Sequence, residues 1–382
     1  MMVISDKTQC CGCSACFSAC PYDAISMVPD KLGFRYPVTD GDKCVGCGLC
    51  EKVCAFVKER DAVTSSEAKA IRNKEVTSLM DSRRGGVFPV LAEHVISKGG
   101  TVYGAAFDGC FNVVHARAES MAEADAFRGS KYVQSHMGDI FRKVREDLHN
   151  GLHVLFSGTP CQVDGLRSFL PERLKSRLVL VDIVCHGVPS PDVWRANLEY
   201  QKNRHEGDVE AVEFRDKKEY GWAAHKETYR IAGKKITDTS YTYLFYRHIM
   251  LRPSCSVCPY ASLSRVSDIT LADFWGWQKA VPGFNDDDRG VSLVLLNTGA
   301  GRVLMQECQS RFDVRDVEIG QCLQPNLRRP SSRDKDSERF ADDFAARGFA
   351  YVLKRYGDKG WRYKVYTFYM NCKRMVKGWL GK

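Results

Sequence analysis

One cysteine spacing occurs twice in the first 54 residues, and it constrains the fold of this region more than any other feature. Both runs are spaced C-x2-C-x2-C-x3-C, and they comprise Cys10, Cys13, Cys16 and Cys20, then Cys44, Cys47, Cys50 and Cys54. In two-cluster runs of this kind, three close thiolates bind one [4Fe–4S] cluster and the displaced fourth binds the other. The spacing therefore predicts one cluster on Cys10, Cys13, Cys16 and Cys54, and a second on Cys44, Cys47, Cys50 and Cys20. Cys11 falls outside the spacing and is interpreted as a bystander.

The context of the cysteines favours metal ligation over disulfides. The chain has 17 cysteines in 382 residues. Its first ten residues lack the apolar core of a secretory signal, and no apolar run approaches the roughly 20 residues of a spanning helix. Because thiols in the cytoplasm stay reduced, we expect a cytoplasmic protein whose thiols bind metal.

Positive charge is concentrated at one end of the chain. The net charge is +9, and residues 324–382 account for all of it. Each cluster with its thiolates would add about −2, so the excess gives no reason to expect a nucleic-acid partner. Residues 361–380 form a basic, aromatic helix candidate. Such a helix either lies on an anionic surface, here the inner membrane surface or an acidic partner, or packs its aromatic residues on the body.

Periodicity predicts a mixed fold after the cysteine-rich module. Residues 25–28 and 34–38 alternate around a turn and indicate a hairpin. Residues 153–184 read as a short apolar strand, a helix and a second apolar strand, which is typical of a βαβ unit with buried parallel strands. The class is α+β or α/β. The predicted domains are a ferredoxin-type module (1–58), a charged Ser/Thr-rich linker (59–80), a mixed α/β body (81–325) and a basic, aromatic, helical tail (326–382).

Four further cysteines lie where chemistry is expected in such a body. Cys161 opens the helix of the βαβ unit and Cys185 ends its second strand, so both lie at the carboxyl edge of the predicted sheet. Cys255 and Cys258 form a C-x2-C pair. These four thiols suffice for a third [4Fe–4S] cluster or for a structural zinc, and the spacing leaves both open. Cys161 alone is also a candidate nucleophile with His186 as its base.

Several short segments occur in an order that resembles one known family. They are residues 84–88 (Arg-Gly-Gly-Val-Phe), 102–107, 128–135 (Arg-Gly-Ser-Lys-Tyr-Val-Gln-Ser), 157–162 (Ser-Gly-Thr-Pro-Cys-Gln), 185–190 (Cys-His-Gly-Val-Pro-Ser), 255–258 and 273–276 (Asp-Phe-Trp-Gly). Together they are similar to the coenzyme F420 hydrogenase/dehydrogenase beta-subunit family, in the form with a fused two-cluster ferredoxin. The resemblance spans residues 5–300.

The resemblance implies a flavin oxidoreductase. Members of the family hold FAD beside a [4Fe–4S] cluster, and the choice of FAD over FMN rests on the resemblance alone. Carried over to this chain, the inner cluster is held by Cys161, Cys185, Cys255 and Cys258. The FAD is expected around Ser82, Gly85, Gly86, Arg128, Gly129, Ser130, Lys131, Tyr132, Gln134 and Thr159. The chain departs from the family where Arg83 and Arg84 interrupt a run that is usually Ser-rich.

Two residues are candidates for catalytic roles. Lys131, or Arg128 beside it, would stabilise a reduced flavin, and His186 would donate a proton. The predicted function is an iron–sulfur flavoprotein oxidoreductase that moves electrons between a small-molecule substrate and ferredoxin-type clusters, with a redox protein or ferredoxin as partner. The alternatives are an electron-transfer subunit without its own substrate site and a catalytically inert cluster-binding scaffold. The sequence identifies neither the substrate, nor the direction of electron flow, nor the oligomeric state.

Overall fold

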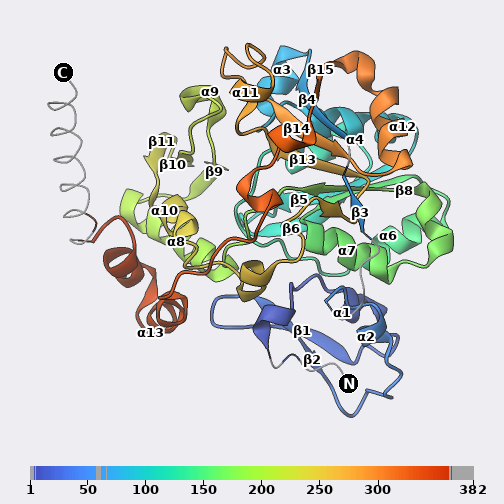
Figure 1. Ribbon diagram of the computed structural model, residues 1–382. Coiled ribbons are helices and arrows are strands. Elements are labelled where there is room, and N and C mark those ends of the chain that lie inside the picture. Colours follow the sequence, from blue (N-terminus) through green and yellow to red (C-terminus); the bar gives the residue numbers. More distant parts are fainter. Residues whose placement is uncertain (1–3, 5, 57–61, 66, 361–362, 364–382) are drawn as a thin grey trace, which may run out of the picture.

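The computed structural model describes residues 4–360 except 5, 57–61 and 66, together with Tyr363. Figure 1 shows a small N-terminal module below a large sheet domain, with a second, smaller group of strands and helices beside the sheet. Apart from Tyr363, the helix expected over 361–380 lies outside the described residues. Among the described residues, no helix combines the length and the hydropathy needed to cross a membrane.

The N-terminal module contains the predicted hairpin between two short helices. Strands β1 (Ile25–Pro29) and β2 (Arg35–Thr39) are antiparallel, with Ile25 opposite Thr39. Helix α1 (Ala15–Ala19) and helix α2 (Leu49–Lys52) each carry one cysteine of a run and contact each other. The two halves of the duplication therefore fold into one compact unit.

Eight strands form the large sheet in the order β15-β4-β14-β13-β8-β7-β5-β6. Their bounds are β4 (Glu67–Asn73), β5 (Thr101–Phe107), β6 (Val113–Ala118), β7 (Val154–Gly158), β8 (Leu178–Ile183), β13 (Ile269–Asp273), β14 (Ser292–Leu296) and β15 (Phe312–Val317). Strands β13, β8, β7 and β5 run parallel, and antiparallel strands complete both edges. The predicted βαβ unit is β7, α7 (Pro160–Phe169) and β8, which confirms the mixed α/β class.

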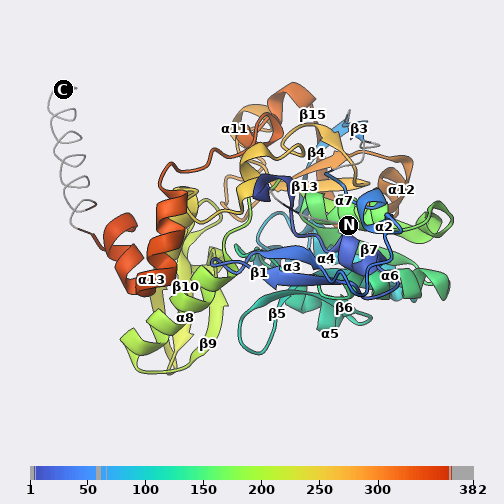
Figure 2. The ribbon, with the colours of Figure 1, turned by 90° about the horizontal axis from the view of Figure 1, so that it is seen from below.

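Helices cover both faces of this sheet. Leu155 of β7 packs in a cluster with α4 (Val87–Ser97) and α12 (Gly299–Glu307). Its neighbour Phe156 points to the other face, into a cluster with α6 (Ile140–His149) and α7. Successive residues of a strand point to opposite faces, so an apolar run such as β7 is buried on both sides. Figure 2 shows the N-terminal module on the side of α6 and α7.

The interval 59–80 is not a linker, which corrects the sequence-based expectation. It contains β3 (Val63–Thr64), β4 and α3 (Val76–Asp81). Strand β4 lies inside the sheet and pairs with both β14 and β15. Its small apolar residues are buried, while Lys69 forms an ion pair with Asp316 of the neighbouring strand. The body therefore begins before residue 81.

The smaller group packs around a three-stranded antiparallel sheet with the order β11-β10-β9. Its elements are α8 (Pro191–His205), β9 (Val209–Glu213), α9 (Lys217–Tyr220), β10 (Glu227–Ile231), β11 (Lys234–Asp238), α10 (Ser240–Tyr246) and α13 (Ser337–Tyr356). Phe340 and Val352 of α13 share a buried cluster with Trp194 of α8. Within the described part of the segment 326–382, helix α13 covers Ser337–Tyr356, and it belongs to the core of this group. The remaining elements are α5 (Met121–Ala124), α11 (Trp277–Ala280), β12 (Ser264–Arg265) and 3-10 turns at Lys7–Gln9, Asp125–Phe127, Glu172–Arg177, Pro253–Val257, Gln309–Arg311, Ile319–Gln321 and Pro325–Leu327.

Glu227 makes the stability of this group dependent on pH. The side chain is 1% exposed, and burial raises its pKa to about 8. The folded state thus keeps a proton that the unfolded state releases above its ordinary pKa near 4.5. The contribution of Glu227 to stability is therefore expected to fall as pH rises from about 5 to about 8, by up to about 1.4 kcal/mol per pH unit. The difference in thermal stability between the wild type and Glu227→Gln should change over this range by that contribution, and equal slopes in both proteins would contradict the prediction.

Candidate functional site

A cavity of about 440 Å³ lies at the carboxyl ends of the parallel strands. Gly158 of β7, Ile183 of β8 and Asp273 of β13 each end a strand and line it. Ligands of open α/β sheets bind at this edge, and the volume lies in the range of small-molecule sites. The cavity is therefore the candidate site for a cofactor or substrate.

Most of the residues expected around a flavin line this cavity. They are Ser82, Gly86, Arg128, Gly129, Ser130, Lys131, Tyr132 and Thr159. Gly85 and Gln134 do not. The amide of Gly85 donates to Ser292 Oγ, and a Cβ at Gly85 would lie 2.1 Å from the carbonyl oxygen of Ile71. Gln134 Nε2 donates to the carbonyl of Cys11, so this side chain faces the N-terminal module instead.

The charged residues of the lining are predominantly cationic. They are Arg83, Arg84, Arg128, Lys131, Arg215 and a single carboxylate, Asp273. Asp273 is paired with Arg215 at 2.9 Å. Arg83 donates to the backbone carbonyls of Trp222 and Ala224 and thereby holds the segment after β9. The excess positive charge suits an anionic ligand such as a phosphate.

The part of the cavity beside α4 contains polar side-chain atoms that are available to a ligand. Ser82 Oγ and Arg84 Nε are buried and have no hydrogen-bond partner among the described residues. Gly86 caps α4 with φ +74°, a conformation that favours glycine. Helix N-termini with an adjacent arginine bind phosphate groups. The residues present therefore fit the phosphate portion of a flavin nucleotide.

Lys131 lines the cavity, but its ammonium group is already engaged. Nζ donates to the carbonyls of Ala126 (2.8 Å) and Arg128 (2.9 Å) and closes the loop between them. Burial lowers the pKa of Lys131 to about 7. The catalytic role expected for Lys131 stays a prediction, and its observed contacts are those of a residue that shapes the loop.

His186 lines the cavity in contact with a second imidazole. Its Nε2 lies 2.6 Å from His248 Nε2, while His248 Nδ1 lies 2.8 Å from the carbonyl oxygen of Ser332. A carbonyl only accepts, so neutral His248 carries its proton on Nδ1 and His186 Nε2–H is the donor between the rings. Burial lowers the pKa of His186 to about 4. The proton-donor role also stays a prediction, because the single N–H of neutral His186 points to His248.

The inner cysteines meet beside this cavity. Cys161, Cys185, Cys255 and Cys258 line one small cavity, and His186 and Gly187 line both this cavity and the large one. Backbone amides donate to two of the sulfurs, from Gly187 to Cys185 and from Val188 to Cys255, each at 3.4 Å. Burial raises the pKa of Cys255 to about 12 and that of Cys258 to about 11.

As thiolates, these four side chains would require a cation to balance them at this depth, and the iron of a [4Fe–4S] cluster would supply that charge. The donor set therefore fits a cluster. Among the described residues, no three His, Cys, Asp or Glu side chains converge on one ion position. The same four thiols also suffice for a structural zinc, the alternative that their spacing leaves open.

Cys11, which is interpreted from the sequence as a bystander, lies close to the other thiols. It is buried and lines the inner cavity, and the neighbouring thiols of Cys13 and Cys161 shift its pKa. Cys13 itself packs on α7, where a Cβ at Gly165 would lie 2.7 Å from its sulfur. The first cysteine run is therefore seated directly against the inner thiols.

The N-terminal cysteines group as the duplicated spacing predicts, and their ligation stays a prediction. Burial raises the pKa of Cys16 to about 12, and the charges of Cys10, Cys54 and Cys50 add to the effect, so Cys54 lies near the first run, as does Cys50 of the second. The other group shares a separate small cavity lined by Cys20, Cys44, Cys47 and Cys50. The large cavity, the inner cysteines, the first group of N-terminal cysteines and the second group thus follow one another in this order.

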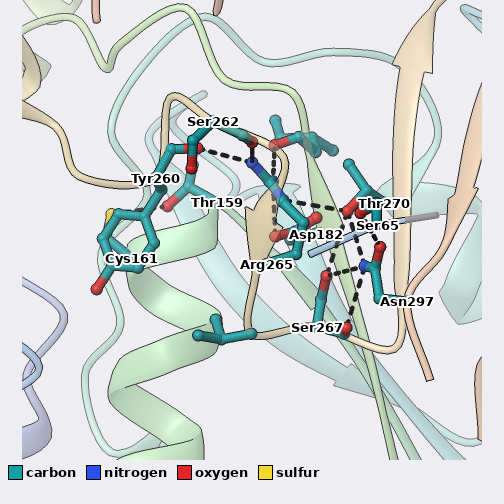
Figure 3. A network of polar contacts seen from close by, with 12 residues as sticks. Ser65, Thr159, Cys161, Asp182, Tyr260, Ser262, Arg265, Ser267, Thr270 and Asn297 are labelled. Atoms are coloured by element: carbon teal, nitrogen blue, oxygen red, sulfur yellow. Dashed lines mark hydrogen bonds and ion pairs between the residues drawn. The ribbon is translucent and has the colours of Figure 1, made fainter. Parts of the chain in front are cut away.

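Arg265 holds together the segments that carry three of the inner cysteines (Figure 3). Its guanidinium donates to Asp182 Oδ2 and to the carbonyl of Tyr260, both at 2.7 Å. Asp182 lies on β8, which leads to Cys185, and Tyr260 follows Cys258. The Tyr260 hydroxyl donates to Asp164 of α7, the helix of Cys161. Arg265 and Asp182 are fully buried, so their charges compensate each other without solvent.

Replacing Arg265 by Met is expected to lower the free energy of unfolding by about 3–5 kcal/mol, because it leaves the Asp182 carboxylate buried without a partner. Iron bound by the inner cysteines should decrease as well, since the Tyr260 carbonyl loses its donor. Chemical denaturation with iron analysis measures both effects. The Asp182→Asn, Arg265→Met double variant removes the buried charge and should regain most of the stability. A single variant as stable as the wild type would contradict this account.

Sequence reasoning missed several residues of the large cavity. His115 lies in the middle of β6, and nothing in its local sequence marks it; burial lowers its pKa to about 4. Trp275 is 43% exposed and stacks on Trp222 at 4.6 Å. Trp275 belongs to the segment 273–276, which from the sequence supports only the family resemblance. Exposed aromatic residues at the edge of a cavity are a signal of binding that only the structure provides.

Two parts of the chain match known families. Residues 152–319 match the C terminus of the beta subunit of coenzyme F420 hydrogenase/dehydrogenase, and residues 9–57 match the 4Fe-4S dicluster domain. Among solved structures, the chain is similar to a chain of the F420-reducing [NiFe] hydrogenase complex from Methanosarcina barkeri. The identity is 17%, the TM-score is 0.46, and the match covers 79% of this chain and 97% of that chain. No curated protein shows significant sequence similarity to the chain. The two family matches confirm the resemblance drawn from the sequence.

Proposed function

We propose that this chain, which carries a 4Fe-4S dicluster domain and the C-terminal domain of the F420 hydrogenase/dehydrogenase beta subunit, is a flavin-dependent oxidoreductase. It would transfer electrons between a small molecule bound in the large cavity and the iron–sulfur clusters. One observation carries the proposal: His186 and Gly187 line both the large cavity and the cavity of the inner cysteines. A ligand in the first would therefore be adjacent to a cluster in the second.

The residues that line the cavity would have two roles, flavin binding and substrate binding. Ser82, Arg84 and the start of α4 would bind the flavin phosphates, and the loop closed by Lys131 would hold the body of the nucleotide. A bound flavin accepts two electrons as a hydride and releases them singly. Trp275 and Tyr246, which are 43% and 52% exposed, also line the cavity and would stack on a planar substrate.

The order of the thiol groups would provide the path for single electrons. Cys161 contacts Cys11, Cys11 contacts Cys13, and Cys54 lies beside Cys16. The inner cysteines would thus pass electrons to the first run, and the second run, with Cys47 exposed, would exchange them with a redox protein or ferredoxin. The matched family consists of beta subunits, which supports a second candidate: an electron-transfer subunit that works only within a larger complex.

A turnover assay separates the two candidates. The anaerobically reconstituted chain would be mixed with benzyl viologen and with excess reduced coenzyme F420, NADH or NADPH, and viologen reduction would be followed. Turnover by the isolated chain supports the enzyme. Flavin and cluster reduction by dithionite without turnover on any donor, but with turnover after addition of a partner, would support the subunit instead. A chain that binds no flavin would contradict both.

A further inference from the structure

Arg252 lies between the inner cysteines and the first cysteine run. Its side chain is 1% exposed. Its backbone belongs to the inner site, because the amide of Cys255 donates to the Arg252 carbonyl at 3.0 Å. Its guanidinium belongs to the N-terminal module, where Nε donates to the carbonyl of Cys10 (2.7 Å) and Nη2 to that of Arg35 (2.9 Å). One residue therefore connects the two sites.

The Arg252 guanidinium contacts the sulfur of Cys10 and is closely packed by neighbouring residues. Nη2 lies 3.6 Å from Cys10 Sγ, and Nη1 donates to Gln134 Oε1 at 2.9 Å. The ring of Tyr36 lies 4.3 Å from the guanidinium carbon. A Cβ at Gly12 would lie 2.7 Å from Nη1, so a side chain at this position would displace the arginine. The backbone of the first run is thus shaped around this cation.

No carboxylate balances this buried charge. Within the part of the chain that the structure describes, no Asp or Glu forms an ion pair with Arg252, whereas the equally buried Arg265 is paired with Asp182. The ionisable groups that act on Arg252 most strongly are Cys10, Tyr36, Cys11 and Cys255. An uncompensated cation in a protein interior is strongly unfavourable. Thiolates of a bound cluster would supply the missing negative charge.

We propose that Arg252 is a positioning residue that raises the reduction potential of the cluster held by Cys10, Cys13, Cys16 and Cys54. A reduced cluster carries one more negative charge than an oxidised one, so a nearby cation and an N–H···S hydrogen bond stabilise the reduced form. The sulfur contact is to Cys10, so this cluster is affected more than the inner one. One electron lost by a cluster on the inner cysteines would be gained by a cluster beside Arg252. This proposal extends the proposed function, because the presence of an inner cluster is itself part of that proposed function.

The test is a redox titration of the intact, cluster-loaded chain monitored by electron paramagnetic resonance. In Arg252→Gln and Arg252→Met, the equilibrium constant for reduction of one N-terminal cluster should fall at least tenfold, which is about 59 mV for one electron. Arg252→Lys keeps the charge, so its equilibrium constant for reduction should stay at least threefold above that of Arg252→Gln. The second N-terminal cluster is an internal control and should stay within threefold of the wild type.

Arg142 offers a matched control. Its guanidinium also attaches the module to the body, through the carbonyls of Ser18 and Cys20, but it is 31% exposed and paired with Asp23. Arg142→Met should therefore leave all potentials within threefold of the wild type. A wild-type potential in Arg252→Gln, or an equal decrease in Arg252→Lys and Arg252→Gln, would overturn the proposal.

If neither neutral variant retains iron, the Arg252→Lys variant tests the proposal alone. It loses the Nη2 contact to Cys10 Sγ, so its equilibrium constant for reduction should fall at least threefold. An unchanged potential in Arg252→Lys would contradict the proposal. A wild-type chain without flavin or inner iron would refute the proposed function. The N-terminal potentials would still decide the role of Arg252.

Discussion

Replacing Cys255 by Ala is expected to remove about four of about twelve iron atoms per chain, because three remaining inner thiols do not hold a [4Fe–4S] cluster stably. Cys255 lies near the other inner thiols, Cys161, Cys185 and Cys258, and accepts a hydrogen bond from the amide of Val188. The two N-terminal clusters have their own eight cysteines and should remain. Iron and sulfide analysis after anaerobic purification measures the loss. Electron transfer from flavin to the N-terminal clusters should slow by at least a hundredfold.

Cys322→Ala is the matched control for this variant. Cys322 is fully buried, and its thiol donates to the carbonyl of Glu318 within its own turn. It lies in the hydrophobic cluster around Trp277, away from the other thiols. Its replacement should leave iron content unchanged. Iron loss in both variants would attribute the effect to instability, and iron loss in neither would show that the inner thiols hold no cluster.

Replacing Arg84 by Met is expected to weaken flavin binding about 10- to 100-fold. Arg84 lines the large cavity beside α4, and its Nε has no partner among the described residues. A charge-assisted hydrogen bond to phosphate is worth about 1.5–3 kcal/mol, which corresponds to this loss of affinity. Equilibrium dialysis of reconstituted protein, followed by flavin fluorescence, measures the dissociation constant.

Arg302→Met removes one positive charge elsewhere and serves as the comparison. Arg302 lies on α12, pairs with Glu67 at 2.9 Å and does not line the cavity. Flavin affinity should not change in this variant. Arg84→Lys should bind with intermediate affinity, because it keeps the charge and loses the forked donors. Unchanged affinity in Arg84→Met would place the phosphates elsewhere in the cavity.

Features that depend on local sequence were predictable. The hairpin β1–β2 and the unit β7–α7–β8 have strong periodicity. Helix α7 begins at Pro160 after the N-cap Thr159, and the side chain of Gln162 accepts from the Thr159 amide. The cysteine runs were equally clear, because ligand spacing is a local property. The carboxyl edge of the sheet followed from the order of strand, helix and strand.

Features that depend on distant partners were not predictable. Strand β4 is built on Ala68 and Ala70, which have weak strand propensity, and its existence depends on pairing with β14 and β15 on both sides. The environment of Arg252 combines residues 10, 12, 36 and 134, which no sequence window brings together. The same holds for Cys11, whose neighbour Cys161 is 150 positions away.

The central claim is that a flavin site, an inner cluster and two N-terminal clusters coexist in one chain. The most direct measurement is the iron, sulfide and flavin content of the anaerobically purified wild-type chain. The account predicts about twelve iron atoms and one flavin per chain, from three [4Fe–4S] clusters and one cavity. About eight iron atoms, no flavin and one zinc would contradict it. The inner cysteines would then form a structural zinc site behind a two-cluster ferredoxin.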